Sequence, residues 1–262
     1  MRCGVKPRGL DLALIASDVP ARVAGVFTRS SIVGAPVQLC RDRVRDGRAR
    51  AVVVNSGISN VAMGQRGERN AAEMTRRAAA AIGAPVEEVL VASTGVIGMP
   101  LPMPSVRRGI RAAGAALAVG GLERAARAIM TTDTFPKTCL VTADVDGTRV
   151  TVAGIAKGSG MIEPDMATML AFLLTDAAVA PAYLRRVLRG AAEAGFNRLS
   201  IDGETSTSDS VLLFANGEGS VRIDPPLPFG LAPGTHISFQ MWYPDPGSSG
   251  LASTNTVSVV MP

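Results

Sequence analysis

Short apolar runs, broken by turn-forming residues, dominate the first hundred positions. Three of these runs are rich in Val, Ile, Leu and Ala and predict strands, namely "LDLALIAS" (10–17), "ARVAGVFTR" (21–29) and "ARAVVVNSG" (49–57). The segment "GERNAAEMTRRAAAAIG" predicts a helix, because strong helix formers fill it and Gly83 ends it. "VEEVLVAST" (86–94) then returns to the pattern of a strand.

The second half of the chain mixes helical and extended periods. Helices are predicted over 105–118 and 122–130, and "PAYLRRVLRGAAEAG" predicts a third, whose apolar face consists of Leu184, Val187, Leu188 and Ala191. "TCLVTADVDGTRVTVAGI" predicts a hairpin that turns at Asp146-Gly147. "DSVLLFANG" predicts one more buried strand. Because these elements do not follow a strict strand–helix–strand repeat, the pattern predicts a mixed α/β fold.

The amino-acid composition changes after residue 217. Proline and glycine crowd "DPPLPFGLAPGTH" and "MWYPDPGSSG", and such residues supply few interiors of helices or strands. We therefore expect one domain over 1–217, followed by an irregular tail over 218–262.

Composition narrows the class of protein. The chain has 262 residues, 47% of them apolar, and a net charge of +5. The densest basic segment, Arg41 to Arg50, contains two aspartates and no aromatic residue, which favours a solvated face over a nucleic-acid site. No segment has the length of a membrane span, and the three cysteines are too scattered for a disulfide framework. We therefore expect a cytoplasmic protein that contacts neither nucleic acid nor membrane.

The single histidine limits the possible chemistry. His236 lies in the tail, whereas Ser-His-Asp and Cys-His catalysis need a well-placed imidazole and histidine-rich metal sites need several. We therefore expect no metal site, and an enzyme with this sequence needs another general base.

Thr168 is the candidate nucleophile. It stands in "KGSGMIEPDMATML", where a loop rich in glycine and proline meets an apolar run. A threonine hydroxyl needs an adjacent base. Cleavage between Ala167 and Thr168 would create an α-amino group with a pKa of about 7.7 to 8.0, which can serve as that base. The alternative is an ordinary threonine at the entrance to a core strand.

Several motifs occur in the order found in the ornithine acetyltransferase family. They are "AGVFTRS", "VVVNSGISNVAMGQRG", "ASTGVIGMP", "RAARAIMTTDTFPK", the stretch around Thr168 and "IDGETSTSDSVLLFANG". Up to about Gly217 the chain resembles this family, the bifunctional glutamate N-acetyltransferases of arginine biosynthesis. The wording of "RAARAIMTTDT" and "EPDMAT" is most similar to the paralogues of clavulanate gene clusters.

The resemblance implies a fold and a set of site residues. The fold is a mixed α/β sheet sandwich flanked by helices, with a self-cleaving architecture like that of N-terminal-nucleophile enzymes. Cleavage would give an α fragment, 1–167, and a β fragment that starts at the nucleophile Thr168. Thr94 and Gly95 would form the oxyanion hole.

Substrate contacts are implied in the same way. Lys157, Thr131 and Thr168 would bind substrate, and Thr132 is an alternative to Thr131. Asp133 is a candidate turn cap. The acidic and hydroxyl cluster "DGETSTSD" (202–209) is left out of the catalytic set, because such clusters often satisfy their own backbone.

The implied reaction has two half-reactions. N-acetylornithine would acetylate Thr168 and release ornithine, and glutamate would then accept the acetyl group. No cofactor is implied, and the α and β fragments would assemble as a heterotetramer.

Beyond Gly217 the chain departs from the family, whose C-terminal substrate-binding motifs are not found. We expect a truncated or rearranged end and, with it, a doubtful transfer activity. Two alternatives therefore stay open. One is an amidohydrolase or aminopeptidase with the same threonine, and the other is a catalytically impaired paralogue that acts as an interaction partner.

Overall fold

The computed structural model describes residues 1–145, 148–160, 169–199, 205–217, 236–244 and 251–260. Seven of its strands form one sheet in the order β3-β2-β1-β7-β6-β5-β4. Their bounds are β1 Leu12–Phe27, β2 Arg48–Ile58, β3 Val89–Val96, β4 Lys137–Val145, β5 Thr148–Lys157, β6 Leu170–Thr175 and β7 Ser210–Ala215. The β2–β3 and β6–β7 pairs are parallel and the others antiparallel, so the predicted mixed sheet is confirmed.

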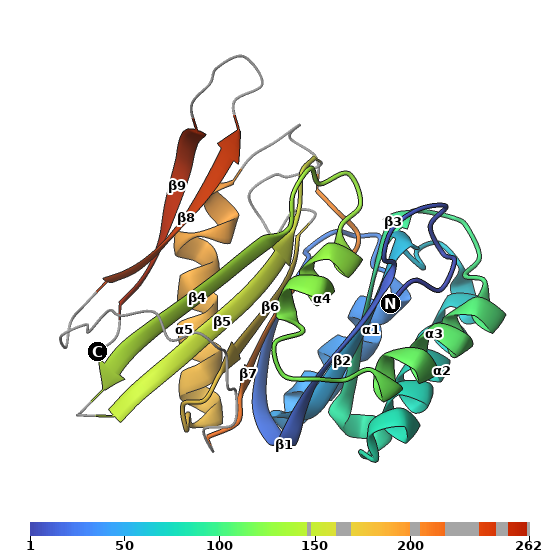
Figure 1. Cartoon of the computed structure of the whole chain (residues 1–262), viewed down its shortest axis with the longest axis horizontal. Helices are drawn as coiled ribbons and strands as arrows, with labels where there is room; N and C mark the ends of the chain where they lie inside the picture. Colours follow the sequence, from blue (N-terminus) through green and yellow to red (C-terminus); the bar gives the residue numbers. More distant parts are fainter. Residues whose placement is uncertain (146–147, 161–168, 200–204, 218–235, 245–250, 261–262) are drawn as a thin grey trace.

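Strand β1 belongs to both halves of this sheet. Its first part pairs with β2, its last part pairs with β7, and the register shifts between Ala16 and Ala21. Such an irregularity lets a strand turn a corner. Figure 1 shows β1 turning back at the bottom of the view. Apolar side chains of both halves join one core cluster, as Leu14 and Val53 do with Phe172 and Phe214, so the halves face each other as a sandwich.

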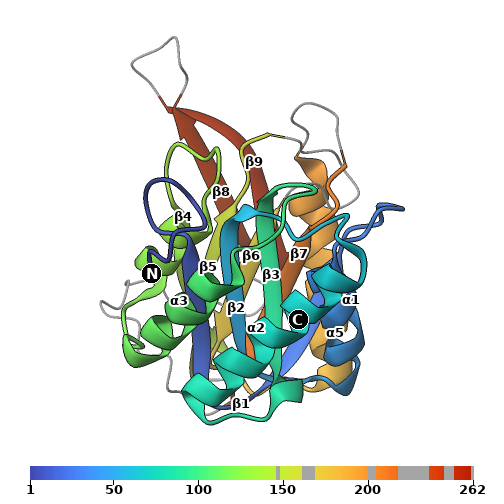
Figure 2. The same ribbon diagram turned by 90° about the vertical axis from the view of Figure 1, so that its right-hand side faces the viewer.

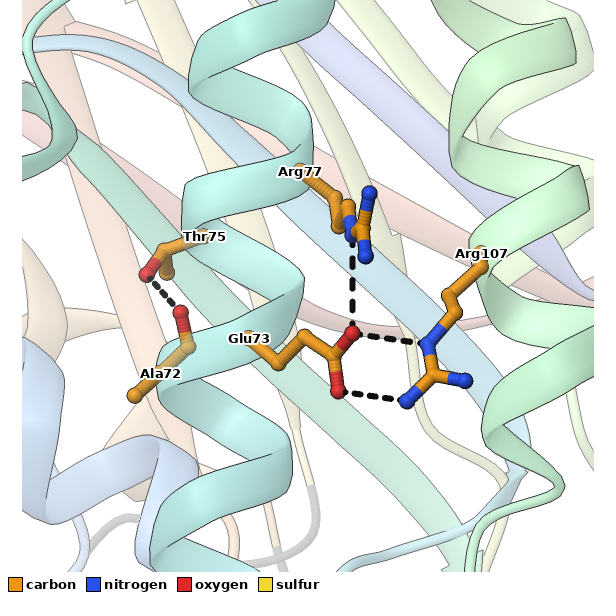
Figure 3. A network of polar contacts seen from close by, with 5 residues as sticks. All are labelled: Ala72, Glu73, Thr75, Arg77 and Arg107. Carbon is orange, nitrogen blue, oxygen red and sulfur yellow. Dashed lines mark hydrogen bonds and ion pairs between the residues drawn. The ribbon is translucent and has the colours of Figure 1, made fainter.

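Helices α2 (Gly64–Ile82) and α3 (Met103–Ala115) cover the outer face of the first half. Figure 2 looks onto them with β2 and β3 behind. Met74 and Ala78 of α2 and Ile110 of α3 are buried there. At their exposed side Glu73 accepts two hydrogen bonds from Arg107, at 2.7 and 2.9 Å, and thereby links the two helices (Figure 3).

Helix α5 (Pro181–Ala194) covers the outer face of the second half. Its buried residues Leu184 and Leu188 pack in a second cluster with Val211 and Leu213 of β7. Of the apolar face predicted for this helix, Leu184 and Leu188 are therefore confirmed as buried, whereas Val187 and Ala191 are half-buried.

Helix α1 (Ala35–Arg43) lies along the free edge of β3. The Cys40 thiol accepts from the backbone N–H of Val91 and donates to its carbonyl, and Arg43 donates to the carbonyl of Val89. These contacts satisfy edge groups that would otherwise invite pairing with another strand. Arg43, which belongs to the basic segment Arg41 to Arg50, thus helps to stabilise the fold.

Three further predicted elements are found with small shifts. The predicted helices over 105–118 and 122–130 correspond to α3 and to α4 (Leu122–Ile129), and α4 contacts strands of both halves of the sheet. Val145 of β4 pairs with Thr148 of β5, which confirms the hairpin, although the turn residues 146–147 lie outside the described part.

The tail contains regular structure that its composition did not predict. Strands β8 (His236–Pro244) and β9 (Leu251–Val260) pair as an antiparallel hairpin, and β9 lies against α5. Alternating residues in "HISFQMWYP" and "LASTNTVSVV" suit strands despite the surrounding prolines. The domain boundary at residue 217 remains a prediction.

Among the described residues, no helix is both long and apolar enough to cross a membrane. The same part of the chain holds no cluster of three or more His, Cys, Asp or Glu side chains suited to a metal ion.

Candidate active site

The ends of strands from both halves of the sheet lie together: β3 and β5 end here, and β6 and β7 begin here. Thr94 lies near the end of β3, and Lys157 is the last residue of β5. Lys157 pairs with Leu170, the first residue of β6, and Leu170 in turn pairs with Ser210, the first residue of β7. This gathering is possible because β1 turns the second half back over the first.

The two halves are joined here by a polar contact. The Lys157 ammonium donates a hydrogen bond to the Thr94 hydroxyl across 3.2 Å. Both residues are buried, with exposed fractions of 2% for Lys157 and 4% for Thr94. Burial lowers the pKa of Lys157, while the nearby carboxylates Asp133 and Asp209 act in the opposite direction.

This contact leaves the Thr94 hydroxyl able to donate. A hydroxyl has one proton and two acceptor lone pairs. Since Lys157 uses one lone pair, the proton of Thr94 is free to reach a developing negative oxygen. An oxyanion hole needs a donor held in place in this way.

Gly95 is held in a conformation and a space that only glycine suits. Its φ is +128°, and a Cβ atom at this position would lie 2.2 Å from the carbonyl carbon of Gly57. Gly57, which pairs with Gly95 across β2 and β3, also has a positive φ of +109°. The close approach of the two backbones holds Gly95, the residue after Thr94, against Gly57 of β2.

Asp133 connects the loop after α4 to the end of β5. Its carboxylate accepts from the backbone N–H of Thr131 (3.1 Å), the backbone N–H of Gly158 (2.8 Å) and the ammonium of Lys137 (2.7 Å). Burial alone would raise the pKa of Asp133, but these hydrogen bonds, led by that of Lys137, hold it below its usual value. The role of Asp133 as a turn cap stays a prediction, whereas its carboxylate links Lys137, the first residue of β4, to the backbone that follows β5.

Thr131 is half-buried next to this carboxylate, whereas the competing Thr132 is exposed. Asp133 thus binds the backbone of Thr131 and that of Gly158, the residue after Lys157. Thr131 and Lys157 are two of the substrate-binding residues expected from the sequence.

The N-terminal segment adds another cation. Asp11 accepts hydrogen bonds from four consecutive backbone N–H groups, those of residues 3–6, and so holds this segment against the sheet. Lys6 donates to the carbonyl of Met130 across 2.9 Å. Lys6 and Lys137 both lower the pKa of Lys157, so three lysines surround Asp133. The excess positive charge favours an anionic substrate.

Asp209 is a site residue that sequence reasoning missed. It belongs to the cluster 202–209, which was interpreted as a turn, and it is 1% exposed. Its Oδ1 accepts from the backbone N–H of Met169 across 2.8 Å. The signal available in the sequence was an aspartate placed directly before β7, a strand that is apolar after its first residue, Ser210.

Two expected site residues cannot be placed. Ala167 and Thr168 lie outside the described residues, and the next residue along the chain, Met169, is buried. Of the expected set, the structure brings together Thr94, Gly95 and Lys157, with Thr131 nearby through Asp133.

Comparisons with known proteins agree on one family. A model of the ArgJ family matches residues 1–229. The arginine biosynthesis bifunctional protein ArgJ of Symbiobacterium thermophilum is 54% identical over 216 residues, which make up 82% of this chain and 54% of that protein. The glutamate N-acetyltransferase Oat2 of Streptomyces clavuligerus is 51% identical over 207 residues, 79% of this chain and 52% of that protein. This chain therefore spans about half the length of these curated relatives.

Two solved structures are similar in sequence and fold. The arginine biosynthesis bifunctional protein ArgJ of Bacillus halodurans is 38% identical with a TM-score of 0.58, over 65% of this chain and 88% of the solved one. The ornithine acetyltransferase of Mycobacterium tuberculosis, solved with ornithine, is 34% identical with a TM-score of 0.57, over 65% of this chain and 90% of the solved one.

Proposed function

Since this chain belongs to the ArgJ family, as its sequence motifs predicted, we propose that it is a self-cleaving acetyltransferase of arginine biosynthesis. It transfers the acetyl group of N-acetylornithine to glutamate through an acetyl ester on Thr168. Thr94 and Gly95 stabilise the oxyanion, and Lys157 and Thr131 bind substrate.

The observation that carries this proposal is the contact between Lys157 and Thr94. It joins the end of β5 to the end of β3, at the point where β6 begins. The buried Met169 follows Thr168 directly, so the candidate nucleophile is covalently tied to this place. We therefore expect a nucleophile, an oxyanion donor and a cation to meet at these strand ends.

Self-cleavage prepares the nucleophile. The Thr168 hydroxyl attacks the carbonyl carbon of Ala167, the carbon–nitrogen bond breaks, and an ester forms. Water hydrolyses this ester, which leaves the Ala167 carboxylate and a free Thr168 with its own α-amino group as base.

Acetyl transfer uses the same atoms. The α-amino group takes the hydroxyl proton while the Thr168 oxygen attacks the acetyl carbon of N-acetylornithine. The negative oxygen of the tetrahedral intermediate accepts hydrogen bonds from the Thr94 hydroxyl and the Gly95 backbone. Ornithine then leaves with the proton, and the glutamate amine attacks the ester in the second half-reaction.

The charges of the site suit these substrates. N-acetylornithine and glutamate both carry an α-carboxylate, and the three lysines outnumber the two nearby carboxylates whose pKa values are held low, Asp11 and Asp133. A relative, the enzyme of Mycobacterium tuberculosis, was solved with ornithine. These facts support an amino-acid substrate.

The lengths of the relatives support cleavage. The part that matches the solved Bacillus halodurans chain is 65% of this chain and 88% of the solved one. The part that matches the Symbiobacterium relative is 82% of this chain but only 54% of that relative. The solved chain is therefore roughly half as long as the curated relative. A chain cut near its middle would have this length.

Intact mass spectrometry of the purified full chain tests the proposal. We expect two fragments that meet between Ala167 and Thr168, and after incubation with N-acetylornithine the fragment that starts at Thr168 should be heavier by one acetyl group. Thr168→Ala should remain a single species and take up no acetyl group. Cleavage of Thr168→Ala at the same junction would contradict the assigned nucleophile.

The same measurement separates the alternatives. Loss of the acetyl group to water without glutamate, seen as free acetate, would favour a hydrolase. A nicked chain that never carries the acetyl group would favour an impaired paralogue. Acetyl transfer by a chain that stays uncut would refute the role given to the α-amino group.

A further inference from the structure

All three lysines of the chain lie around one carboxylate, that of Asp133. Lys6, Lys137 and Lys157 are the only lysines of the sequence, and every other cation of the basic side chains belongs to an arginine. Asp133 binds Lys137 directly and attracts Lys6 and Lys157 through space. Three cations therefore compete for one carboxylate.

Lys137 is the lysine that binds this carboxylate. Its ammonium lies 2.7 Å from Oδ1 of Asp133, and the two side chains are 8% and 0% exposed. The same ammonium lies over the ring of Phe135, 4.8 Å from the centroid. The backbone N–H of Gly158 also donates to Oδ1, and that of Thr131 donates to Oδ2. Since a carboxylate oxygen has two lone pairs, Lys137 and Gly158 fill Oδ1.

Lys157 has no comparable partner. It is 2% exposed, and among the described residues its ammonium donates to the Thr94 hydroxyl but has no carboxylate oxygen within ion-pair distance. An ammonium has three protons to donate, and a buried cation without a counter-ion is unfavourable. Within the described part of the chain, the site therefore contains a buried cation without an anion of its own.

Asp133 is the carboxylate that Lys157 would bind if Lys137 were absent. Four charged groups of the described residues act on Lys157. In order of decreasing effect they are Asp133, Asp209, Lys137 and Lys6. The N–H of Gly158, the residue after Lys157, already binds Asp133. A lysine side chain is flexible, so the ammonium of Lys157 can turn to an Oδ1 that Lys137 no longer occupies.

We propose that Lys137 is a positioning residue for substrate binding: by occupying Asp133, it keeps the ammonium of Lys157 available to the α-carboxylate of an amino-acid substrate. This inference rests on the proposed function, in which Lys157 binds substrate. An ion pair between Lys157 and Asp133 would neutralise the charge that the substrate binds, and it would draw the ammonium away from Thr94.

Two variants separate this role from a purely structural one. Removing one partner of a buried ion pair leaves a charge without compensation, whereas replacing both partners by neutral residues is often tolerated. Lys137→Met should therefore leave the Asp133 carboxylate to bind Lys157. Adding Asp133→Asn to Lys137→Met removes that competing anion, so Lys157 should become available again.

Binding is measured on the purified full chain by NMR. Isotope labelling of lysine at Cε gives signals from three residues only, and Lys6→Met and Lys137→Met assign them. The Lys157 signal is followed while glutamate is added. We expect the Kd of glutamate to rise about 10- to 100-fold in Lys137→Met, the loss of one hydrogen bond to a charged group. In the double variant it should return to within about threefold of the wild-type value.

Lys6→Met is the control for net charge. It also removes one cation near Lys157, but it leaves the pair of Asp133 and Lys137 intact. If net charge alone determined binding, Lys6→Met and Lys137→Met would weaken it to a similar degree. We expect the smaller effect in Lys6→Met, and an equal or larger one would overturn the inference.

The titration of Lys157 gives a second readout that needs no substrate. In Lys137→Met the pKa of Lys157 should rise, because a repelling cation is gone and the Asp133 carboxylate pairs with its ammonium. In the double variant the pKa should fall below that of Lys137→Met. A Lys157 pKa that does not move in Lys137→Met would contradict the pairing, even if binding weakens.

A folding defect does not remove the test. Thermal unfolding shows whether each variant is folded. If Lys137→Met does not fold, the double variant, which buries neither charge, decides the question. A folded double variant that binds glutamate more than about tenfold weaker than wild type would contradict the inference. A wild-type chain that neither binds glutamate nor takes up acetyl from N-acetylornithine would overturn the proposed function, while the titration of Lys157 would still test the pairing.

Discussion

The Thr94 hydroxyl accepts a hydrogen bond from Lys157, and in the function that we propose it also donates one to the oxyanion. Thr94→Val keeps the shape of the side chain and removes both hydrogen bonds. We expect kcat/KM for acetyl transfer to fall about 10²- to 10³-fold, the usual loss for one oxyanion donor. Thr94→Ser keeps the hydroxyl group and should recover most of the activity. Equal activity of the Val and Ser variants would exclude the hydroxyl group from catalysis.

Asp209 also makes the stability of the fold depend on pH. In the folded state the carboxyl group of Asp209 keeps its proton up to about pH 8, because burial raises its pKa. In the unfolded chain the same group releases the proton near pH 3.8. The unfolded state therefore binds fewer protons between these values, and the free energy of unfolding falls as the pH rises through this window.

Asp209→Asn removes this titration. The free energy of unfolding of Asp209→Asn minus that of wild type should grow from pH 5 to pH 8 and then level off, as measured by urea unfolding at several pH values. A difference that is constant with pH would show that the raised pKa is wrong.

The helices α2 and α3 are held in place by buried apolar side chains and by an ion pair at their exposed side. Met74 is fully buried on the inner side of α2, so Met74→Ala should lower the free energy of unfolding by about 2 to 5 kcal/mol. Arg107 reaches Glu73 at the exposed side of the same pair, where solvent screens the charges (Figure 3). Arg107→Ala should therefore cost much less than Met74→Ala in urea unfolding, and the reverse order would contradict this division.

The Glu73 contribution should depend on pH in the opposite direction to that of Asp209. Hydrogen bonding by Arg107, above all, lowers the pKa of Glu73, so its stabilisation is present at neutral pH. It should disappear as the pH falls through the lowered pKa, and the stability difference between wild type and Arg107→Ala should shrink in acid.

Most elements could be predicted from the pattern of the sequence, but their connections could not. The runs at 10–17 and 21–29 were predicted as two strands, and the structure joins them as β1 with a register shift between them. Local pattern does not reveal that one strand serves both halves of a sandwich. The hairpin β8–β9 was missed because the nearby prolines outweighed the alternation within its strands.

The same limit applies to the site. Thr94, Gly95 and Lys157 were named because motifs carry them, and the structure brings them together. Asp133 and Asp209 act through contacts that depend on strand order, such as the bond from Met169 to Asp209. The position of Asp209 just before a strand was visible in the sequence, but the partner of its carboxylate, the N–H of Met169, was not.

At the scale of the whole molecule, the proposed cut falls between strands that interlock. In the sheet order, β7 and β6 lie between β1 and β5, so the fragment that starts at Thr168 is inserted between two strands of the other fragment. Six residues of β1 pair with β7, Arg22 to Phe27, and six of β5 pair with β6, Val152 to Lys157.

We therefore expect the two fragments to remain together after cleavage. Size-exclusion chromatography under native conditions should give one species that contains both, and only a denaturing gel should separate them. A β fragment that elutes alone without denaturant would contradict the interlocked sheet.

This arrangement also sets a sequence of events. A separately synthesised 1–167 would begin with β3-β2-β1 and β5-β4 as two isolated ladders, because the strands that join them lie on the other piece. In the maturation that we propose, the sheet therefore assembles in the uncut polypeptide first, and the cut between Ala167 and Thr168 comes afterwards.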